Sequence, residues 1–409
     1  MKHRYVITGL GQVSSMGNDM SEMRSGFSGD KTGFAVEHRG ESAYPVAKAT
    51  GFDFYKLGFQ LKTYADRVSQ LCACAARQAI GHSELELEED DADVDAAGRG
   101  LLTASQFGCL DSASRYLHQL KTLRKSRFAS PLYFMHSICN MPNSITATEL
   151  RLKGVSNHLA GSSESGLMTL WQGIRFMESG QSEYVIAGGA DGISDELIGQ
   201  LHSLGLLGTG PEPARWRGPF DQERKHAVWG EAAAFVRMEK EETALRGGKR
   251  VYGVVKGIGM ATSASGRSRA RAIEEAMRAA IERSGIRPGG LSFVAANANG
   301  TMTADWLEAA AIEAVCGPDT PVYAPKSYFG ETSSAAGLLG IVSVLALTGE
   351  RLPVNRHTYE PDRRIALNVG YGDREKVCIR PGDHFIVNGY NRGGVSVSVC
   401  IEVCGGGSR

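Results

Sequence analysis

Residues 154–166 read Gly-Val-Ser-Asn-His-Leu-Ala-Gly-Ser-Ser-Glu-Ser-Gly, and the apolar stretch Leu167–Ile174 follows directly. This order places Ser163 at a tight turn that leads into a helix, which is where a nucleophile would stand. A serine without a neighbouring base is inert at neutral pH, because the pKa of a hydroxyl lies far above that of a thiol. Ser163 is therefore either a small residue that fits the turn or a serine that other groups activate.

Two further segments combine a tight turn with polar side chains. Residues 297–303 read Asn-Ala-Asn-Gly-Thr-Met-Thr, and residues 326–331 read Lys-Ser-Tyr-Phe-Gly-Glu. Asn299 can donate a hydrogen bond but cannot shuttle a proton. Glu331 supplies a carboxylate, which would repel an anionic substrate. We predict a structural ion pair between Lys326 and Glu331.

The three segments resemble the active-site motifs of β-ketoacyl synthases, the condensing enzymes of the thiolase-like superfamily. In that family the first motif carries a cysteine nucleophile, and the other two each supply a histidine. Here those positions hold Ser163, Asn299 and Glu331, whereas Lys326 is retained. The resemblance therefore implies the fold of a condensing enzyme without the cysteine and the two histidines. We expect no catalytic residue. A decarboxylase is disfavoured, because that activity still needs the histidines.

The resemblance extends over nearly the whole chain, from Tyr5 to Val403. Besides the three motifs, short segments match the family in order and spacing, namely Val6–Gly11, Ala187–Ala190 and Pro219–Arg224. The resemblance implies an α/β protein with a thiolase-like fold, in which two duplicated halves form a layered α-β-α-β-α arrangement.

The alternation of short apolar strands with helical patterns favours a mostly parallel sheet. A strand followed by a Gly-rich turn occurs twice, at 6–11 and again at 254–259, and the polar segment 239–250 lies between the two. We therefore predict an N-terminal half at residues 1–248 and a C-terminal half at residues 249–409.

The composition of the 409 residues is that of a globular protein, with a formal net charge of +0 and 42% hydrophobic residues. No global field would attract nucleic acid, and no apolar run reaches membrane-spanning length. The eight cysteines are scattered, so we expect buried reduced thiols rather than a metal site. Reduced thiols are typical of the cytoplasm, where we expect the protein to be located. We expect no cofactor. The acidic run Glu84–Asp95 is either a solvated segment or an interaction surface.

A family member that keeps the fold but lacks the cysteine resembles the chain length factors of type II polyketide synthases. Those subunits pair with an active ketosynthase and close the far end of the acyl tunnel between the two chains. The resemblance implies a ketosynthase and an acyl carrier protein as partners. Known chain length factors of aromatic pathways usually carry glutamine at the cysteine position, so Ser163 leaves the choice between aromatic and aryl polyene relatives open.

By position, the segment 106–120 looks like the helix that forms the floor of that tunnel. The candidate tunnel residues are Leu110, Ala113, Ser114 and Leu117 on one helical face, and Tyr133, Phe134 and Met135 toward the partner. An apolar stripe of this kind is also typical of ordinary dimer core. Arg392 replaces an aromatic residue of the family's gating loop, where it would block an apolar entrance or pair with Glu331.

A basic stretch follows this segment and comprises Lys121, Arg124, Lys125 and Arg127. It would either steer an acidic acyl carrier protein or form a solvated face. Two rival functions stay open. In the first, Ser163 is the nucleophile of an acyltransferase or hydrolase, with Glu331 as its base. In the second, the chain is a homodimeric acyl-binding or regulatory protein.

Overall fold

The computed structural model describes residues 3–29, 31, 33–61, 63–81, 98–208, 216–263, 269–370 and 377–405. The predicted acidic run at 84–95 lies outside these residues. Within them, one mixed sheet has eleven strands in the order β12-β11-β10-β13-β14-β9-β1-β8-β6-β4-β5. The strands are β1 (Tyr5–Ser14), β4 (Arg99–Ser105), β5 (Ser156–Ala160), β6 (Tyr184–Asp191), β8 (Ala232–Lys240), β9 (Gly253–Thr262), β10 (Phe293–Ala295), β11 (Pro321–Tyr323), β12 (Asn368–Val369), β13 (His384–Tyr390) and β14 (Val395–Val403).

The strand order repeats, which is the signature of two duplicated halves. In the first half the order across the sheet is β1-β8-β6-β4-β5. In the second it is β9-β14-β13-β10-β11, with the two-residue strand β12 added beside β11 at the outer edge. Numbered along the chain within each half and without β12, both orders are first, fifth, fourth, second, third. The division between residues 248 and 249 falls in the connection before β9 and stays a prediction.

The expectation of a mostly parallel sheet is wrong. Five of its ten strand pairings are antiparallel, among them β1 with β8 and β13 with β14. Strands β13 and β14 are joined by the four residues 391–394, and so short a connection permits only antiparallel pairing. In the first half β8 likewise returns antiparallel between β1 and β6.

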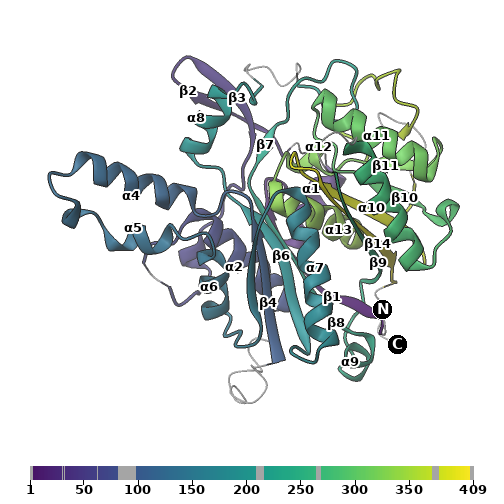
Figure 1. The fold of residues 1–409 in the computed structure, drawn as a ribbon, viewed down its shortest axis with the longest axis horizontal. Coiled ribbons are helices and arrows are strands. Elements are labelled where there is room, and N and C mark those ends of the chain that lie inside the picture. Colours follow the sequence, from purple (N-terminus) through teal and green to yellow (C-terminus); the bar gives the residue numbers. More distant parts are fainter. Residues whose placement is uncertain are drawn as a thin grey trace.

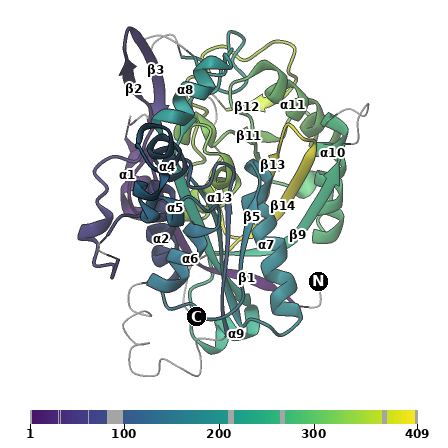
Figure 2. The ribbon, with the colours of Figure 1, turned by 60° about the vertical axis from the view of Figure 1, so that its left-hand side comes forward.

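Helices α7 and α13 lie between the two halves of the sheet (Figures 1 and 2). Every residue of α13 from Ala336 to Leu345 is buried, as expected of an apolar helix that is covered on all sides. On the outer faces α2 covers the first half and α10 the second. The helices are α1 (Met20–Ser28), α2 (Arg67–Ile80), α4 (Leu110–Thr122), α5 (Pro131–His136), α6 (Met141–Glu149), α7 (Ser163–Glu178), α8 (Asp195–Ser203), α9 (Glu241–Arg246), α10 (Arg269–Ser284), α11 (Met302–Cys316), α12 (Lys326–Phe329) and α13 (Ala336–Ala346).

Two features project from this layered body. A small sheet of β2 (Ala35–Arg39), β3 (Ser42–Ala47) and β7 (Trp229–Gly230) stands at one end. Helices α4 and α5 form a hairpin that extends sideways, at the left of Figure 1. Because this hairpin leaves the body, much of its surface has no cover within the described chain.

The cysteines only partly follow the expectation of buried thiols. Cys72, Cys74, Cys109 and Cys400 are buried, whereas Cys139 and Cys378 are exposed. Burial raises the pKa of the Cys72 thiol to about 12, so this side chain is an inert part of the core.

Candidate functional site

Ser163 is the first residue of α7, directly after the edge strand β5 and a two-residue turn. Its side chain is buried. The backbone of Gly389 packs directly against it, because a Cβ at Gly389 would lie 2.5 Å from the carbonyl oxygen of Ser163. The serine is therefore covered by the end of β13 in the second half of the chain.

The structure brings the three degenerate positions and the retained lysine together. Lys326 Nζ lies 2.8 Å from Glu331 Oε2 and donates a hydrogen bond to Ser163 Oγ at 3.2 Å. Asn299 Nδ2 donates to Glu331 Oε2 at 2.9 Å. Both charged side chains are almost fully enclosed, with 5% exposure for Lys326 and 7% for Glu331. The predicted ion pair between these two residues is confirmed.

Glu331 is the centre of this cluster. Its Oε1 accepts the backbone N–H of Ser333 at 3.1 Å and faces the hydroxyl of Ser163 at 3.4 Å. With Lys326 and Asn299 on the other oxygen, the carboxylate has a full set of donors. A carboxylate has no hydrogen-bond donor, so Glu331 cannot give an incoming carbonyl the hydrogen bond that a histidine would give.

The loop that carries Asn299 keeps its shape through local hydrogen bonds. Asn299 Oδ1 accepts both the backbone N–H and the hydroxyl of Thr301, at 3.1 and 2.8 Å. The backbone N–H groups of Asn299 and Gly300 donate to Asp305 Oδ1. Burial raises the pKa of Asp305 to about 6, against the lowering effect of its hydrogen bonds and of Arg224. The loop therefore stays ordered without a histidine.

Behind this loop, Glu308 is a buried carboxyl group on α11. It accepts hydrogen bonds from the backbone N–H of Asn297 and from Asn388 Nδ2, both at 2.9 Å. The hydroxyl of Tyr390 donates to its other oxygen at 3.3 Å. Burial nevertheless raises the pKa of Glu308 from its ordinary value of 4.5 to about 7.

This raised pKa predicts a pH-dependent stability. The folded state keeps the Glu308 proton up to about pH 7, whereas the unfolded chain releases it near pH 4.5. The folded state thus binds more protons between these values, and the free energy of unfolding falls as the pH rises through that window. Urea unfolding at a series of pH values should show a shallower fall for Glu308→Gln. An unchanged slope in this variant would contradict the assignment.

Arg392 does not take part in the cluster. It lies exposed in the turn between β13 and β14, and in the described part of the chain Glu331 pairs with Lys326 instead. The suggested pairing of Arg392 with Glu331 is therefore wrong, since the two side chains are respectively exposed and enclosed. The neighbouring Asn391 holds the turn in place, because its Nδ2 donates to Glu164 Oε1 at 2.6 Å. A role for Arg392 at an acyl entrance stays a prediction.

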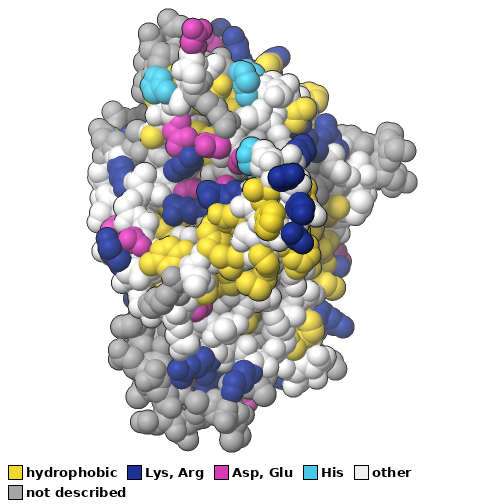
Figure 3. Space-filling model, turned by 90° about the vertical axis from the view of Figure 1, so that its left-hand side faces the viewer, with side chains coloured by type: hydrophobic (Ala, Val, Ile, Leu, Met, Phe, Trp, Pro, Cys, Tyr) yellow, Lys and Arg dark blue, Asp and Glu magenta, His cyan; other side chains and the backbone are white. Residues whose placement is uncertain are grey.

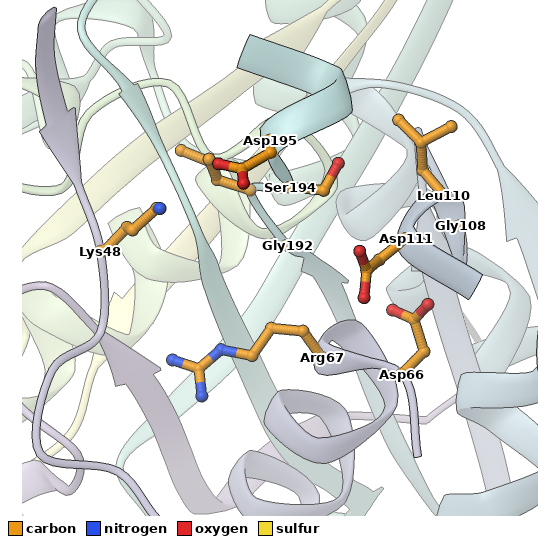
Figure 4. Close-up of a pocket in the computed structure, with 10 residues that line it drawn as sticks. Lys48, Asp66, Arg67, Gly108, Leu110, Asp111, Gly192, Ser194 and Asp195 are labelled. Carbon is orange, nitrogen blue, oxygen red and sulfur yellow. The ribbon is translucent and has the colours of Figure 1, made fainter. Parts of the chain in front are cut away.

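The candidate tunnel residues lie on the projecting hairpin, away from the cluster. Leu110 is half-buried against α8 and borders a polar pocket of about 190 Å³, whose lining also includes Lys48, Asp66 and Asp111 (Figure 4). Along α4 the exposure increases, from half-buried Ala113 and Ser114 to 56% for Leu117.

On α5, Tyr133 is half-buried and stacks edge-on against Tyr64, with ring centroids 5.1 Å apart. Phe134 and Met135 are exposed. The basic residues Lys121, Arg124, Lys125 and Arg127 are exposed at the tip of the hairpin. None of these side chains touches the cluster around Glu331, so their tunnel and docking roles stay predictions.

Sequence reasoning missed Asp191, the last residue of β6. Its carboxylate is buried and joins the turn before α4 to the segment that follows Glu331. The Ala187–Ala190 motif stops one residue short of it. An acidic residue at the end of a fully buried strand was the available signal.

The described residues contain no group of three or more His, Cys, Asp or Glu side chains that would hold a metal ion. None of the helices there combines the length and apolar character needed to cross a bilayer.

Two family descriptions match the chain. "Beta-ketoacyl synthase, N-terminal domain" matches residues 4–244, and "Beta-ketoacyl synthase, C-terminal domain" matches residues 252–358. A 3-oxoacyl-[acyl-carrier-protein] synthase 2 from Coxiella burnetii is 29% identical, over 98% of this chain and 99% of its own length. A malonyl-ACP decarboxylase of polyketide biosynthesis from Bacillus subtilis is 25% identical, over 98% of both chains.

Solved structures show the same fold. The ishigamide ketosynthase/chain length factor superposes with a TM-score of 0.86 at 22% identity, over 98% of this chain and 100% of that one. A ketosynthase in complex with its chain length factor from Xenorhabdus doucetiae gives 0.82 at 18% identity, over 98% of both chains. The motif order, the duplicated sheet and these matches agree, and the chain belongs to the β-ketoacyl synthase family, with a thiolase-like fold.

Proposed function

We propose that this chain is a non-catalytic chain length factor, which pairs with an active ketosynthase and limits product length in type II polyketide biosynthesis, of the aryl polyene or aromatic kind. The observation that supports this most is the enclosed cluster at the degenerate positions. Glu331 and Lys326 neutralise each other at 2.8 Å, and the positions of the family's two histidines hold Asn299 and Glu331. The chain thus keeps the fold of a condensing enzyme, while the side chains at its reactive positions bind one another.

The exposed surface of the α4–α5 hairpin supports a large partner. Its apolar side chains gather on one face beside several Lys and Arg side chains (Figure 3). The exposed apolar residues there are Leu117, Leu123, Phe128, Phe134, Met135 and Ile138. A contiguous apolar patch of this kind on a folded protein marks an interaction surface.

The edge strand β5 supports the same conclusion. It is the last strand in the sheet order and pairs with β4 on one side only in the described chain. An open edge presents unpaired N–H and C=O groups to which a strand of another chain can add. A partner with the same fold would complete this edge with its own copy of β5 and cover the hairpin at the same time.

The function is tested by reconstitution. The chain alone should form no condensation product from malonyl-loaded acyl carrier protein. Adding a cysteine-bearing ketosynthase should give products whose length differs from those of the ketosynthase alone. Condensation by this chain alone would contradict the proposal. Labelling of Ser163 by a fluorophosphonate would instead favour the acyltransferase or hydrolase.

Shortening a side chain on the tunnel face should lengthen the product. Leu117 is 56% exposed, so Leu117→Ala costs the isolated chain little stability while it enlarges the space that α4 borders. Leu110→Ala should act in the same direction nearer the base of the helix. Mass spectrometry of the products of the reconstituted complex measures the effect. An unchanged length distribution in both variants would remove these residues from the tunnel.

The alternative of a homodimeric acyl-binding protein predicts a different assembly. In it the hairpin and β5 of one chain contact those of a second copy of the same chain. We do not propose decarboxylation of malonyl-ACP for this chain, although it is related to a malonyl-ACP decarboxylase. In this chain the position of the second histidine holds the carboxylate of Glu331, which is paired with Lys326 and cannot donate a hydrogen bond to a malonyl group.

A further inference from the structure

Asp191 is a buried carboxylate with an unusual number of donors. It ends β6, is 2% exposed and accepts hydrogen bonds from two separate segments. Burial raises its pKa, and the surrounding donors offset only part of that rise. A buried carboxylate that is satisfied by several neutral donors fixes the positions of all of them, because losing any one leaves charge without compensation.

The first set of donors belongs to the turn that leads into α4. Ser105 Oγ donates to Asp191 Oδ1 at 2.8 Å, and the backbone N–H groups of Gln106 and Phe107 donate to the same oxygen at 3.0 Å. Ser105 Oγ also accepts the N–H of Gly108, at 2.9 Å. Gly108 has a φ of 56°, a conformation that favours glycine. The whole turn is therefore organised around one carboxylate.

The second set belongs to the segment just after Glu331. Ser334 donates to Asp191 Oδ2 twice, from its backbone N–H at 3.0 Å and from Oγ at 2.6 Å. A second path joins the same two segments. The ring of Phe107 packs against that of Trp229, and the backbone of Trp229 forms a β-bridge with that of Glu331. The turn before α4 is thus held to the degenerate site.

The start of α4 is anchored at other points as well. The Tyr64 hydroxyl lies 2.9 Å from Ser112 Oγ, and Leu110 packs against α8. Asp66 Oδ2 accepts the N–H and the hydroxyl of Ser112, at 2.9 and 2.6 Å, and so ties the first turn of α4 to α2. Cys109, the residue directly before α4, makes no hydrogen bond through its side chain that would cap the helix. The residues that follow Asp191, from Gly192 to Asp195, border the same pocket as Leu110 (Figure 4).

We propose that Asp191 is the positioning residue that fixes where α4 begins relative to the degenerate site, and that it thereby sets the length limit of the acyl tunnel along α4. The second part rests on the proposed function, whereas the first does not. Nothing in this role requires Asp191 to touch the acyl chain. It acts through the turn at 105–108, which places Leu110 and the helix behind it.

The first test uses a native thiol as the reporter. Cys109 lies at the end of the turn and is buried, and burial raises the pKa of its thiol, so it should react slowly with N-ethylmaleimide. Ser105→Ala and Ser334→Ala each remove one donor from Asp191 and should fold even if Asp191→Asn does not. We expect both to raise the labelling rate of Cys109 about tenfold, because local opening becomes easier.

Two controls make this measurement specific. Cys378 is exposed and lies far along the chain from the turn at 105–108, so it should label at the same rate in every variant. Ser343→Ala removes a buried hydroxyl of α13 that bonds to Gly340 and has no contact with Asp191, so it should leave Cys109 unreactive. An unchanged Cys109 rate in both Ser105→Ala and Ser334→Ala would overturn the positioning role.

The second test measures product length in the reconstituted complex with a ketosynthase. Ser105→Ala and Ser334→Ala should broaden the length distribution, whereas Ser343→Ala should change neither length nor breadth. Faster labelling of Cys109 together with an unchanged distribution of product lengths would overturn the proposal that Asp191 sets the length limit. If the unsubstituted chain forms no complex, the proposed function fails, and the Cys109 result still decides the positioning role.

Discussion

Replacing Glu331 with alanine is expected to lower the free energy of unfolding by about 3–5 kcal/mol, the usual cost of leaving one partner of a buried ion pair alone. Lys326 is almost fully enclosed, and its other hydrogen bond, to Ser163 Oγ at 3.2 Å, is with a neutral group. The variant would thus bury an ammonium without its ion-pair partner. Urea unfolding of the purified chain at neutral pH measures the loss.

The matched control removes both charges together. A Lys326→Met, Glu331→Leu double variant should recover most of the lost stability, because a buried ion pair can often be replaced by apolar side chains of similar size. The free energy of unfolding should then fall for the single variant and largely return for the double one. A loss below about 1 kcal/mol in Glu331→Ala would show that water reaches Lys326 and that the cluster is not closed.

Replacing Phe134 with aspartate should weaken the complex with a ketosynthase by about 2–4 kcal/mol, which is roughly 30-fold to 1,000-fold in the dissociation constant. Phe134 is exposed at the centre of α5 and contacts Tyr116 with ring centroids 5.4 Å apart. A buried aromatic at an interface commonly supplies this much, and a carboxylate in its place would be desolvated without a partner. Titration of the ketosynthase with each variant measures the constant.

Leu245→Asp provides the control for this substitution. Leu245 is an exposed apolar residue on α9, at the opposite end of the fold from the hairpin (Figure 1). The same change of chemistry there should leave the dissociation constant unaltered. Equal weakening by both variants would indicate a general loss of solubility, and no weakening by Phe134→Asp would remove α5 from the interface.

The sequence predicted the candidate site well, because the site is built from short motifs with fixed spacing. Ser163, Asn299, Lys326 and Glu331 were singled out as a group, and the fold places the first three within hydrogen-bonding distance of Glu331. The ion pair followed from charge alone, since a buried glutamate close to a retained lysine has few other ways to be satisfied.

Features that depend on the direction of strands and turns, or on contacts between distant segments, were harder to predict. The antiparallel pairing of β13 with β14 depends on the turn at 391–394, which the family resemblance led us to treat as a gate rather than a hairpin. Arg392 seemed close to Glu331 because both belong to motif segments, yet the turn directs Arg392 to solvent. The end of a buried strand marked the position of Asp191, but its contacts could not be predicted because its donors lie 84 to 143 residues away.

The central claim is that this chain is the inactive half of a heterodimer, and co-purification tests it most directly. The tagged chain would be co-expressed with the genes that adjoin its own, and the intact assembly weighed by native mass spectrometry. We predict a one-to-one complex with a chain that carries cysteine at the position of Ser163 and histidines at those of Asn299 and Glu331. A stable homodimer of this chain, formed in the presence of such a ketosynthase, would contradict the account.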